Sequence, residues 1–175
     1  MLNKALFSDN GNCGFVLKPD ILRFPTHYFD PSNLNTMMNK KILQIKIISA
    51  QNLPKSDQLV NDITDSYVVV QTYGVDSDRN EQKTKTINDN GFNPIWNEDL
   101  RFDINCPELA FVKFKVLDKD NASSDDLIGH YTIRFQNIRC GYRHIKLVNK
   151  YSKGTLFVGI KIQPFESMYD IMNKM

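Results

Sequence analysis

The sequence has few cysteines and no long apolar run. Its cysteines, Cys13, Cys106 and Cys140, are three in number and far apart in a chain of 175 residues, which argues against a disulfide framework and against CxxC-type zinc sites. We interpret Cys106 and Cys140, at strand ends, as packing residues, and the cysteine usage favours a reducing, cytosolic compartment. No apolar stretch approaches the roughly 20 residues that a membrane-spanning helix needs, and the first residues lack the apolar core of a signal peptide.

The sequence also lacks an excess of charge of either sign. It has 22 Lys and Arg against 20 Asp and Glu, for a formal net charge of +2, so nothing in the balance indicates nucleic acid as a partner. With 41% hydrophobic and 24% charged residues, the composition is that of a globular protein, and the length allows one domain with an appendage. Long segments with the helical period of 3.6 residues are missing, so long helices are not expected.

What the sequence does have is a series of short segments in which apolar and polar residues alternate. "KILQIKIIS" (Lys41–Ser49) and "FVKFKVLD" (Phe111–Asp118) show the alternation most clearly, as half-buried strands do. Six further candidates cover residues 66–74, 81–87, 96–105, 127–135, 142–148 and 155–163. Eight short strands separated by polar turns predict an all-β fold, an antiparallel sandwich or barrel over residues 41–163. Residues 1–40, rich in turn-forming clusters, are expected to be irregular, and residues 164–175 form a C-terminal tail.

Aspartates are concentrated in three connections between these strands. The first, "LPKSDQLVNDITDS", and the second, "NDNGFNP", contribute Asp57, Asp62, Asp65 and Asp89. The third, "VLDKDNASSDDLIG", contributes Asp118, Asp120, Asp125 and Asp126. These are the first, third and fifth connections of an antiparallel run, which lie at the same end of a meander or a Greek-key sandwich. We therefore expect the three acidic loops to converge.

Converging carboxylates repel one another, and a hard cation relieves that repulsion. Ca²⁺ takes about six to eight oxygen ligands in irregular geometry, whereas Mg²⁺, the alternative, prefers an octahedral site that keeps water. No Cys or His lies in the three loops. An EF-hand is excluded, because a loop starting at Asp118 would have Ser123 in the place of its glycine and Gly129 in the place of its glutamate. The competing interpretation is that Asp and Asn serve here only as turn formers.

Several motifs together resemble a C2 domain, in the version found at the C-terminal end of phosphoinositide-specific phospholipase C of the delta type. The motifs are "ILQIKIISAQNLP", "DSYVVVQTYG", "NGFNPIWNEDLRFDI", "LAFVKFKVLDKD", "DDLIGHYTI", "GYRHIKL" and "GTLFVGIKI". Upstream, "DNGNCGFVLKPDILR" (Asp9–Arg23) is similar to the end of the Y half of that family's catalytic barrel. The resemblance covers about residues 9–163 and implies an eight-stranded antiparallel Greek-key β-sandwich, with the tail of the barrel and a linker in residues 1–40.

The resemblance also implies the residues that bind calcium in the first two loops. Asp65 matches the principal bridging aspartate of the family, and Ile63 matches a ligand through its backbone carbonyl. Asp57 matches an outer position. Asp89 stands where the delta type has an Asn ligand, so its carboxylate either raises calcium affinity or adds repulsion when no ion is bound.

In the third loop, Asp118 and Asp120 match the family's paired aspartates. Lys119, between them, matches a carbonyl donor, and Asp126 matches an outer position. By analogy more than one Ca²⁺ binds, with Asp65, Asp118 and Asp120 shared between the ions.

The function implied is a calcium-dependent, phospholipid-binding C2 module that targets a phosphoinositide phospholipase C to membranes in signal transduction. Lipid phosphates would complete the coordination of Ca²⁺. Leu59 and Val60, near the tip of the first loop, either enter the headgroup region or pack under their own loop. Lys113 and Lys115 form either a basic face for anionic lipids or an ordinary solvated strand face.

The resemblance places the family's catalytic residues on barrel strands that precede Asp9, so we expect no catalysis from this chain. The whole protein is expected to hydrolyse phosphatidylinositol 4,5-bisphosphate. The expected partners are an anionic phospholipid membrane and the rest of the catalytic barrel, not nucleic acid. We expect a monomer in the cytoplasm that binds membranes peripherally when calcium rises. The alternative is a calcium-independent C2 scaffold for protein–protein or interdomain contacts, since one fold serves many functions.

Overall fold

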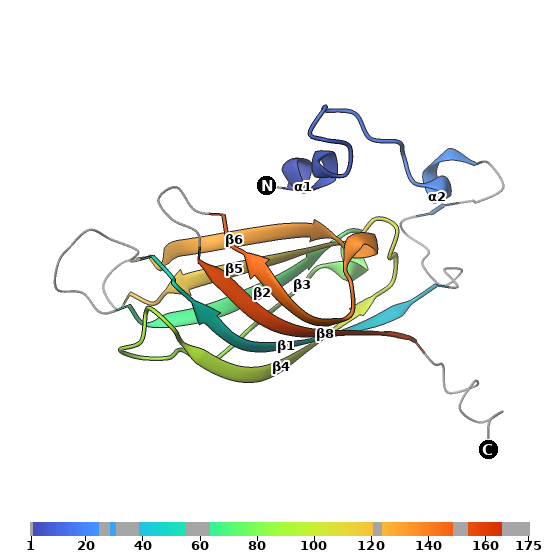
Figure 1. Ribbon diagram of the computed structural model, residues 1–175. Coiled ribbons are helices and arrows are strands. Elements are labelled where there is room, and N and C mark those ends of the chain that lie inside the picture. Colours follow the sequence, from blue (N-terminus) through green and yellow to red (C-terminus); the bar gives the residue numbers. More distant parts are fainter. Residues whose placement is uncertain are drawn as a thin grey trace, which may run out of the picture.

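The protein is a β-sandwich of two four-stranded antiparallel sheets (Figure 1). The computed structural model describes residues 2–24, 29–30, 39–54, 64–120, 124–148 and 154–165. One sheet has the strand order β4-β1-β8-β7 and the other the order β3-β2-β5-β6. The strands are β1 (Lys41–Gln51), β2 (Ser66–Tyr73), β3 (Asn80–Lys83), β4 (Ile95–Ile104), β5 (Phe111–Asp118), β6 (Asp126–Arg134), β7 (Gly141–Lys146) and β8 (Thr155–Pro164). The predicted all-β class and the eight-stranded sandwich are confirmed.

The alternation seen in the sequence decides which side chains form the core. In β5, Val112, Phe114 and Val116 are almost completely buried between the sheets, whereas Lys113 and Lys115 are on the outer face. In β1, Leu43, Ile45 and Ile47 are fully buried in the same core. Successive side chains of a strand point to opposite faces, so each inner face becomes continuous apolar surface.

β3 ends earlier than the sequence predicts, at Lys83 instead of residue 87. The Thr84 hydroxyl accepts a hydrogen bond from the backbone N–H of Val68 (3.0 Å), and the next N–H, of Lys85, donates to the Glu98 carboxylate of β4 (2.9 Å). The chain therefore leaves β2 and turns toward the other sheet. Ile87 pairs with β2 again, through an isolated bridge to Ser66.

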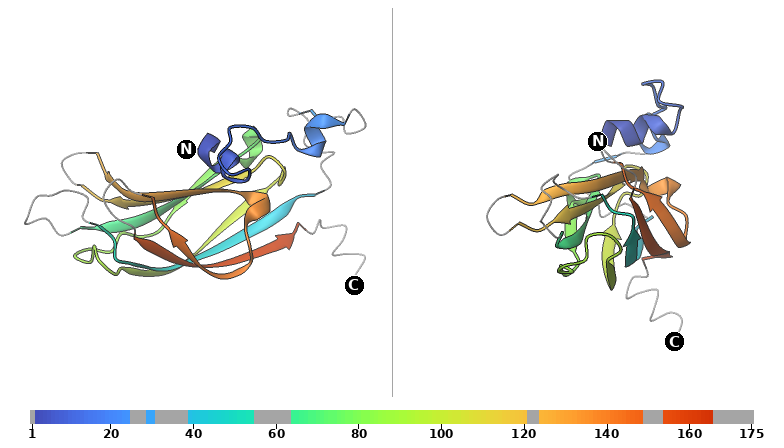
Figure 2. Two further views of the ribbon diagram at one scale, coloured as in Figure 1. Left: turned by 45° about the horizontal axis from the view of Figure 1, so that its top comes forward. Right: turned by 60° about the vertical axis from the view of Figure 1, so that its left-hand side comes forward.

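Two short helices lie in the N-terminal region, which the sequence predicts to be irregular. They are α1 (Leu2–Ser8) and α2 (Asp20–Arg23), and both lie outside the sandwich (Figures 1 and 2). α1 contacts β6 and buries Ala5. The carboxylate of Asp9 forms an ion pair with Arg134 (3.0 Å) and accepts a hydrogen bond from the Asn137 side chain (2.5 Å). Among the described residues, no helix is long and apolar enough to cross a membrane.

All three cysteines are free thiols, but their surroundings differ. Cys106 is completely buried, and this burial raises the pKa of its thiol to about 11. Cys140 is exposed in the turn before β7, so its interpretation as a packing residue is wrong.

Candidate metal centre

The three acidic connections meet at one end of the sandwich. β1 and β5 end there and β6 begins there, at the left of Figure 1. Backbone-to-carboxylate hydrogen bonds join Asp65 of the first connection to Asp118 of the third, and Asp89 of the second connection to Asp65. We call this end, with Asp65, Asp89, Asp118, Asp120 and Asp126, the acidic end.

Asp118 is a buried carboxylate at the end of a core strand. It follows the buried Val116 by two positions on β5, so its side chain is on the inner face and is only 3% exposed. Burying an ionised group is costly unless it is hydrogen-bonded. Its Oδ1 accepts the backbone N–H of Asp65 (2.8 Å), while the N–H of Lys119 donates to the carbonyl of Asp65 (2.9 Å). The exit of the first loop is thus fixed against the start of the third.

The second loop packs directly on the exit of the first. The N–H of Asp89 donates to Oδ1 of Asp65 (3.0 Å). Asp89 has a left-handed backbone with φ of 56°, a conformation that Asp and Asn tolerate better than most residues. Gly91 lies so close to Thr64 that a Cβ at position 91 would be 2.3 Å from the Thr64 Cβ. A glycine is therefore required for this contact.

The third loop is connected to β2 through a tyrosine. The Tyr67 hydroxyl donates a hydrogen bond to Asp125, and the N–H of Asp120 donates to the other oxygen of Asp125 (3.2 Å). The hydrogen bond from Tyr67 lowers the pKa of Asp125. Burial, followed by the interaction with Asp125, raises the pKa of Tyr67 to about 12. Asp126 pairs across the ladder with Asp118.

Sequence reasoning missed the roles of Tyr67 and Asp125. Asp125 was visible as one of the acidic residues of the third loop, but Tyr67 is 58 positions away. The pairing of β2 with β5, and of β5 with β6, places the two near each other. The Asp57, Leu59, Val60 and Ile63 predictions lie outside the described residues, and their roles stay predictions.

The oxygen groups at the acidic end are of the kind that bind a hard cation. They are carboxylates and backbone carbonyls, and the described part of the three loops contains no Cys or His. Oδ1 of Asp65 already accepts a hydrogen bond from the N–H of Asp89. A carboxylate has about four acceptor positions, so Asp65 can still bind further partners. Within the described residues, no three His, Cys, Asp or Glu side chains are grouped closely enough to bind a metal as they stand. The donor chemistry fits Ca²⁺ better than a thiophilic metal.

Exposed apolar side chains flank the acidic end. Phe92, in the second loop, is 60% exposed, and its carbonyl accepts the N–H of Leu53 (3.2 Å). Leu127, next to Asp126, is 41% exposed. Trp96 is instead buried, and its indole N–H donates to the carbonyl of Ser66 (3.2 Å).

The basic residues of β5 lie on the outer face of the second sheet. Burial, and then the charge of Lys115, lower the pKa of Lys113. Burial, and then the charge of Lys113, lower the pKa of His130 on the adjacent strand β6. Lys113, Lys115 and His130 are all partly buried, and Lys115 lies opposite His130 across the β5–β6 ladder.

Comparison with known proteins identifies the family. The model described as "C2 domain" matches residues 41–150. The chain is 45% identical over 150 residues to "Inactive phospholipase C-like protein 2" of Mus musculus, a match that covers 83% of this chain and 13% of that protein. It is 41% identical over 163 residues to "1-phosphatidylinositol 4,5-bisphosphate phosphodiesterase delta-1" of Rattus norvegicus, a match that covers 90% of this chain and 22% of that protein. The chain thus spans less than a quarter of the length of these curated relatives.

Solved structures give the same result. The crystal structure of L. pealei PLC21 matches with a TM-score of 0.79 and 32% identity, over 93% of this chain and 21% of that one. A domain of plant Extended Synaptotagmin 1, also of the C2 type, matches with a TM-score of 0.60 and 21% identity, over 74% of this chain and 98% of that one. The second likeness concerns the fold alone.

Proposed function

The chain belongs to the C2 domain family, and from this premise we propose that it binds anionic membranes in a calcium-dependent manner. Its homologues are phospholipases C of the delta type and inactive phospholipase C-like proteins. A membrane-targeting module of a phosphoinositide phospholipase C is consistent with that membership. The calcium dependence is the specific part of the proposal.

One observation carries this proposal: aspartates of three separate connections are joined to one another through backbone-to-carboxylate hydrogen bonds at Asp65. Asp65 accepts from the second loop and donates to the buried Asp118 of the third. Like charges held near one another cost free energy. Backbone hydrogen bonds hold these aspartates at one end of the sandwich, where a cation would draw their carboxylates together.

The residues of the chain have distinct roles in this proposal. Asp65, Asp89, Asp118 and Asp120, with the predicted ligands of the first loop, would bind the ion. Bound Ca²⁺ would supply positive charge and accept lipid phosphate oxygens as further ligands. Tyr67 and the backbone hydrogen bonds around Asp65 hold the loops in place. The loops would therefore lose less conformational freedom when the ion binds.

Membrane contact is proposed for the apolar rim of the acidic end. Phe92 and Leu127 are exposed beside the proposed ligands, and Leu59 and Val60 are predicted to be on the neighbouring loop. Lys113 and Lys115, near each other on the outer face, would add attraction to anionic lipids, about 1 kcal/mol per basic residue close to the surface.

For the whole protein we propose phosphoinositide hydrolysis at the cytoplasmic side of membranes, in view of the name that the delta-type relative carries. The catalytic residues would then lie outside this chain, and the purified chain would release no inositol phosphates. Phe15 and Leu17, in the segment that is similar to the end of a barrel, are 81% and 70% exposed. The remainder of the protein would cover them.

Co-sedimentation with phosphatidylserine vesicles tests the proposal. We expect the chain to sediment with the vesicles in Ca²⁺ and to stay in the supernatant in a chelator. Because full burial of a Phe side chain is worth about 1.5–3 kcal/mol, Phe92→Asp should weaken binding by about tenfold or more. Tyr142→Asp is the matched control, since Tyr142 is 70% exposed on β7. Equal sedimentation with and without Ca²⁺ would contradict calcium dependence.

A second candidate function is a calcium-independent scaffold for protein or interdomain contacts. It is favoured by the hydrogen bonds that already occupy Asp65 and Asp118, and by the lack of a ready group of three metal-binding side chains within the described residues. In that case Asp65→Asn would leave vesicle binding unchanged in Ca²⁺.

A further inference from the structure

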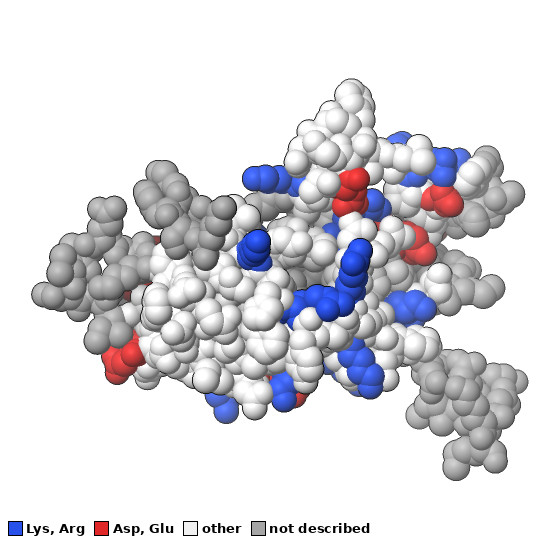
Figure 3. Space-filling model, in the orientation of Figure 1, with Lys and Arg blue, Asp and Glu red and all other residues white. Residues whose placement is uncertain are grey.

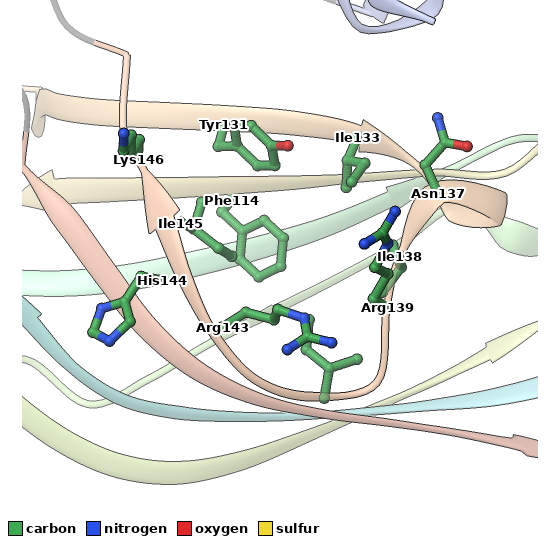
Figure 4. A pocket seen from close by; sticks show the side chains of 11 residues that line it. Phe114, Tyr131, Ile133, Asn137, Ile138, Arg139, Arg143, His144, Ile145 and Lys146 are labelled. Atoms are coloured by element: carbon green, nitrogen blue, oxygen red, sulfur yellow. The ribbon is translucent and has the colours of Figure 1, made fainter.

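A cavity of about 390 Å³ opens on the side of the sandwich, away from the acidic end. It lies between β6 and β7, which are edge strands of different sheets. At one end, His130 and Val148 close the gap with two backbone hydrogen bonds (3.1 and 2.7 Å). At the other end, the 3₁₀ helix η3 (Phe135–Asn137) and the chain that follows it close the gap. Figure 4 shows the side chains that point into this opening.

The floor of the cavity is apolar. Phe114 of β5, Ile145 of β7 and Ile160 of β8 form its deepest part, and all three are buried in the core cluster. Ile133 and Ile138 form its sides and are only partly buried. A volume of several hundred Å³ with a mainly apolar lining and a few polar groups is typical of small-molecule sites.

The rim of the cavity is basic. Arg139, Arg143 and Lys146 line it and are exposed, and no Asp or Glu is among the described residues of the lining. Figure 3 shows basic side chains grouped near the middle of this face, beside a broad uncharged area. An anion at the mouth would meet this positive charge, and the Asp9 carboxylate, which accepts from Asn137 of the lining, is already paired with Arg134.

The guanidinium of Arg143 is held in place by its own turn. Nη1 donates to the carbonyl of Tyr142 (2.8 Å) and Nη2 to the carbonyl of Cys140 (2.6 Å). Gly141, between them, has φ of +96°, a conformation that glycine adopts at little cost. A guanidinium carries five N–H donors, so donors remain for a ligand while the side chain loses little freedom on binding.

We propose that this cavity binds an anionic amphiphile from solution, namely a single alkyl or acyl chain that ends in a phosphate or carboxylate. The chain would lie on Phe114, Ile145 and Ile160, and the headgroup would be bound by Arg139 and Arg143. A small inorganic anion would leave the floor uncovered, and a neutral apolar molecule would make no use of the rim. The site is on a different part of the molecule from the acidic end, so it does not depend on calcium binding.

The test is isothermal titration of the whole chain with octyl phosphate, below its micelle concentration and in a calcium chelator. Inorganic phosphate is the headgroup control and octyl glucoside is the tail control. We expect saturable binding of one octyl phosphate per chain, and at least tenfold weaker binding of either control. Absence of saturable octyl phosphate binding would overturn the proposal, and so would equal binding of either control.

Charge reversal locates the site. Arg139→Glu with Arg143→Glu should weaken octyl phosphate binding at least tenfold, since two cations at the mouth become anions. Lys83→Glu with Lys85→Glu makes the same change in charge on exposed residues of the β3 region, and should have less than a twofold effect. If the double variant is unstable, Arg139→Glu alone replaces it in this test. Arg143 is the riskier substitution because its side chain also bonds to the carbonyls of its own turn. Equal losses in the rim variants and in the Lys83/Lys85 control would show that binding follows net charge and would refute the site.

Discussion

Asp65 connects the three loops of the acidic end, because its backbone N–H, carbonyl and carboxylate each bond to a different neighbour. The partners are Asp118, Lys119 and Asp89. That three aspartate-rich connections meet at one end could be predicted from the sequence, since it follows from counting strands. The particular contacts could not, because they depend on backbone groups whose positions are set by strand register.

The hydrogen bond between Tyr67 and Asp125 should make stability depend on pH at both extremes. The pKa of Asp125 is lowered in the fold, so its contribution is present above its unfolded pKa, about 4, and is lost as the pH falls through the lowered value. The pKa of Tyr67 is raised from 10.0 to about 12, so its contribution is present below pH 10 and is lost as the pH rises toward 12.

Tyr67→Phe removes this bond and tests it. Urea midpoints of the wild type and the variant should differ most between about pH 5 and pH 9, and the difference should shrink at both pH 3 and pH 11. A constant difference across this range would show that the variant affects packing alone.

Gly91 should be irreplaceable even by alanine. A Cβ at this position would be 2.3 Å from the Thr64 Cβ, so Gly91→Ala must displace the second loop, at a cost of about 1–3 kcal/mol. At Gly159 the nearest atom to an added Cβ is at 3.5 Å, an ordinary contact. Urea denaturation should show a clear loss for Gly91→Ala and at most a small one for Gly159→Ala, and similar losses would contradict the loop contact.

At the scale of elements, the alternation of β1 and β5 predicted their positions well because a strand between core and solvent has one apolar face. The end of β3 could not be predicted, since Thr84 and Glu98 end it through tertiary hydrogen bonds. α1 could not be predicted either. A helix of seven residues is too short to be stable alone, and it forms here against β6.

A buried aspartate joins two connections at the end of the sandwich away from the acidic end. Asp78, in the 3₁₀ helix η2 (Asp76–Asp78), is fully buried, and its carboxylate accepts the N–H groups of Asn105 (2.6 Å) and Cys106 (3.1 Å). Asp78→Ala would leave these donors unpaired and should cost about 3 kcal/mol of unfolding free energy.

The matched control for this prediction is Asp76→Ala. The Asp76 side chain is 95% exposed, so its loss should matter little. Thermal denaturation should separate the two variants by about 6–12 °C. Equal melting temperatures would show that the Asp78 carboxylate does not tie the connections together.

At the scale of the whole molecule, a rigid sandwich carries different chemistry on different surfaces. The acidic end offers oxygen donors, the side between β6 and β7 offers an apolar cavity with basic residues, and the outer face of the second sheet carries α1. Asp9 of the N-terminal segment reaches Arg134 and Asn137, so that segment packs on the sandwich. The sequence predicted only an irregular segment here, and its packing against β6 could not be predicted because it depends on tertiary contacts.

The central claim is that Asp65 and Asp118 belong to a calcium site at the acidic end. A thermal melt in chelator, then in Ca²⁺, with Mg²⁺ as control, tests it most directly. A ligand that binds only the folded state adds about 2.7 kcal/mol at a hundred times its dissociation constant, which corresponds to about 5–11 °C in a chain of this size. We predict a rise of this order that Ca²⁺ gives and Mg²⁺ does not, and that Asp65→Asn with Asp118→Asn abolishes. An unchanged melting temperature in saturating Ca²⁺, or an equal rise in the double variant, would contradict the claim.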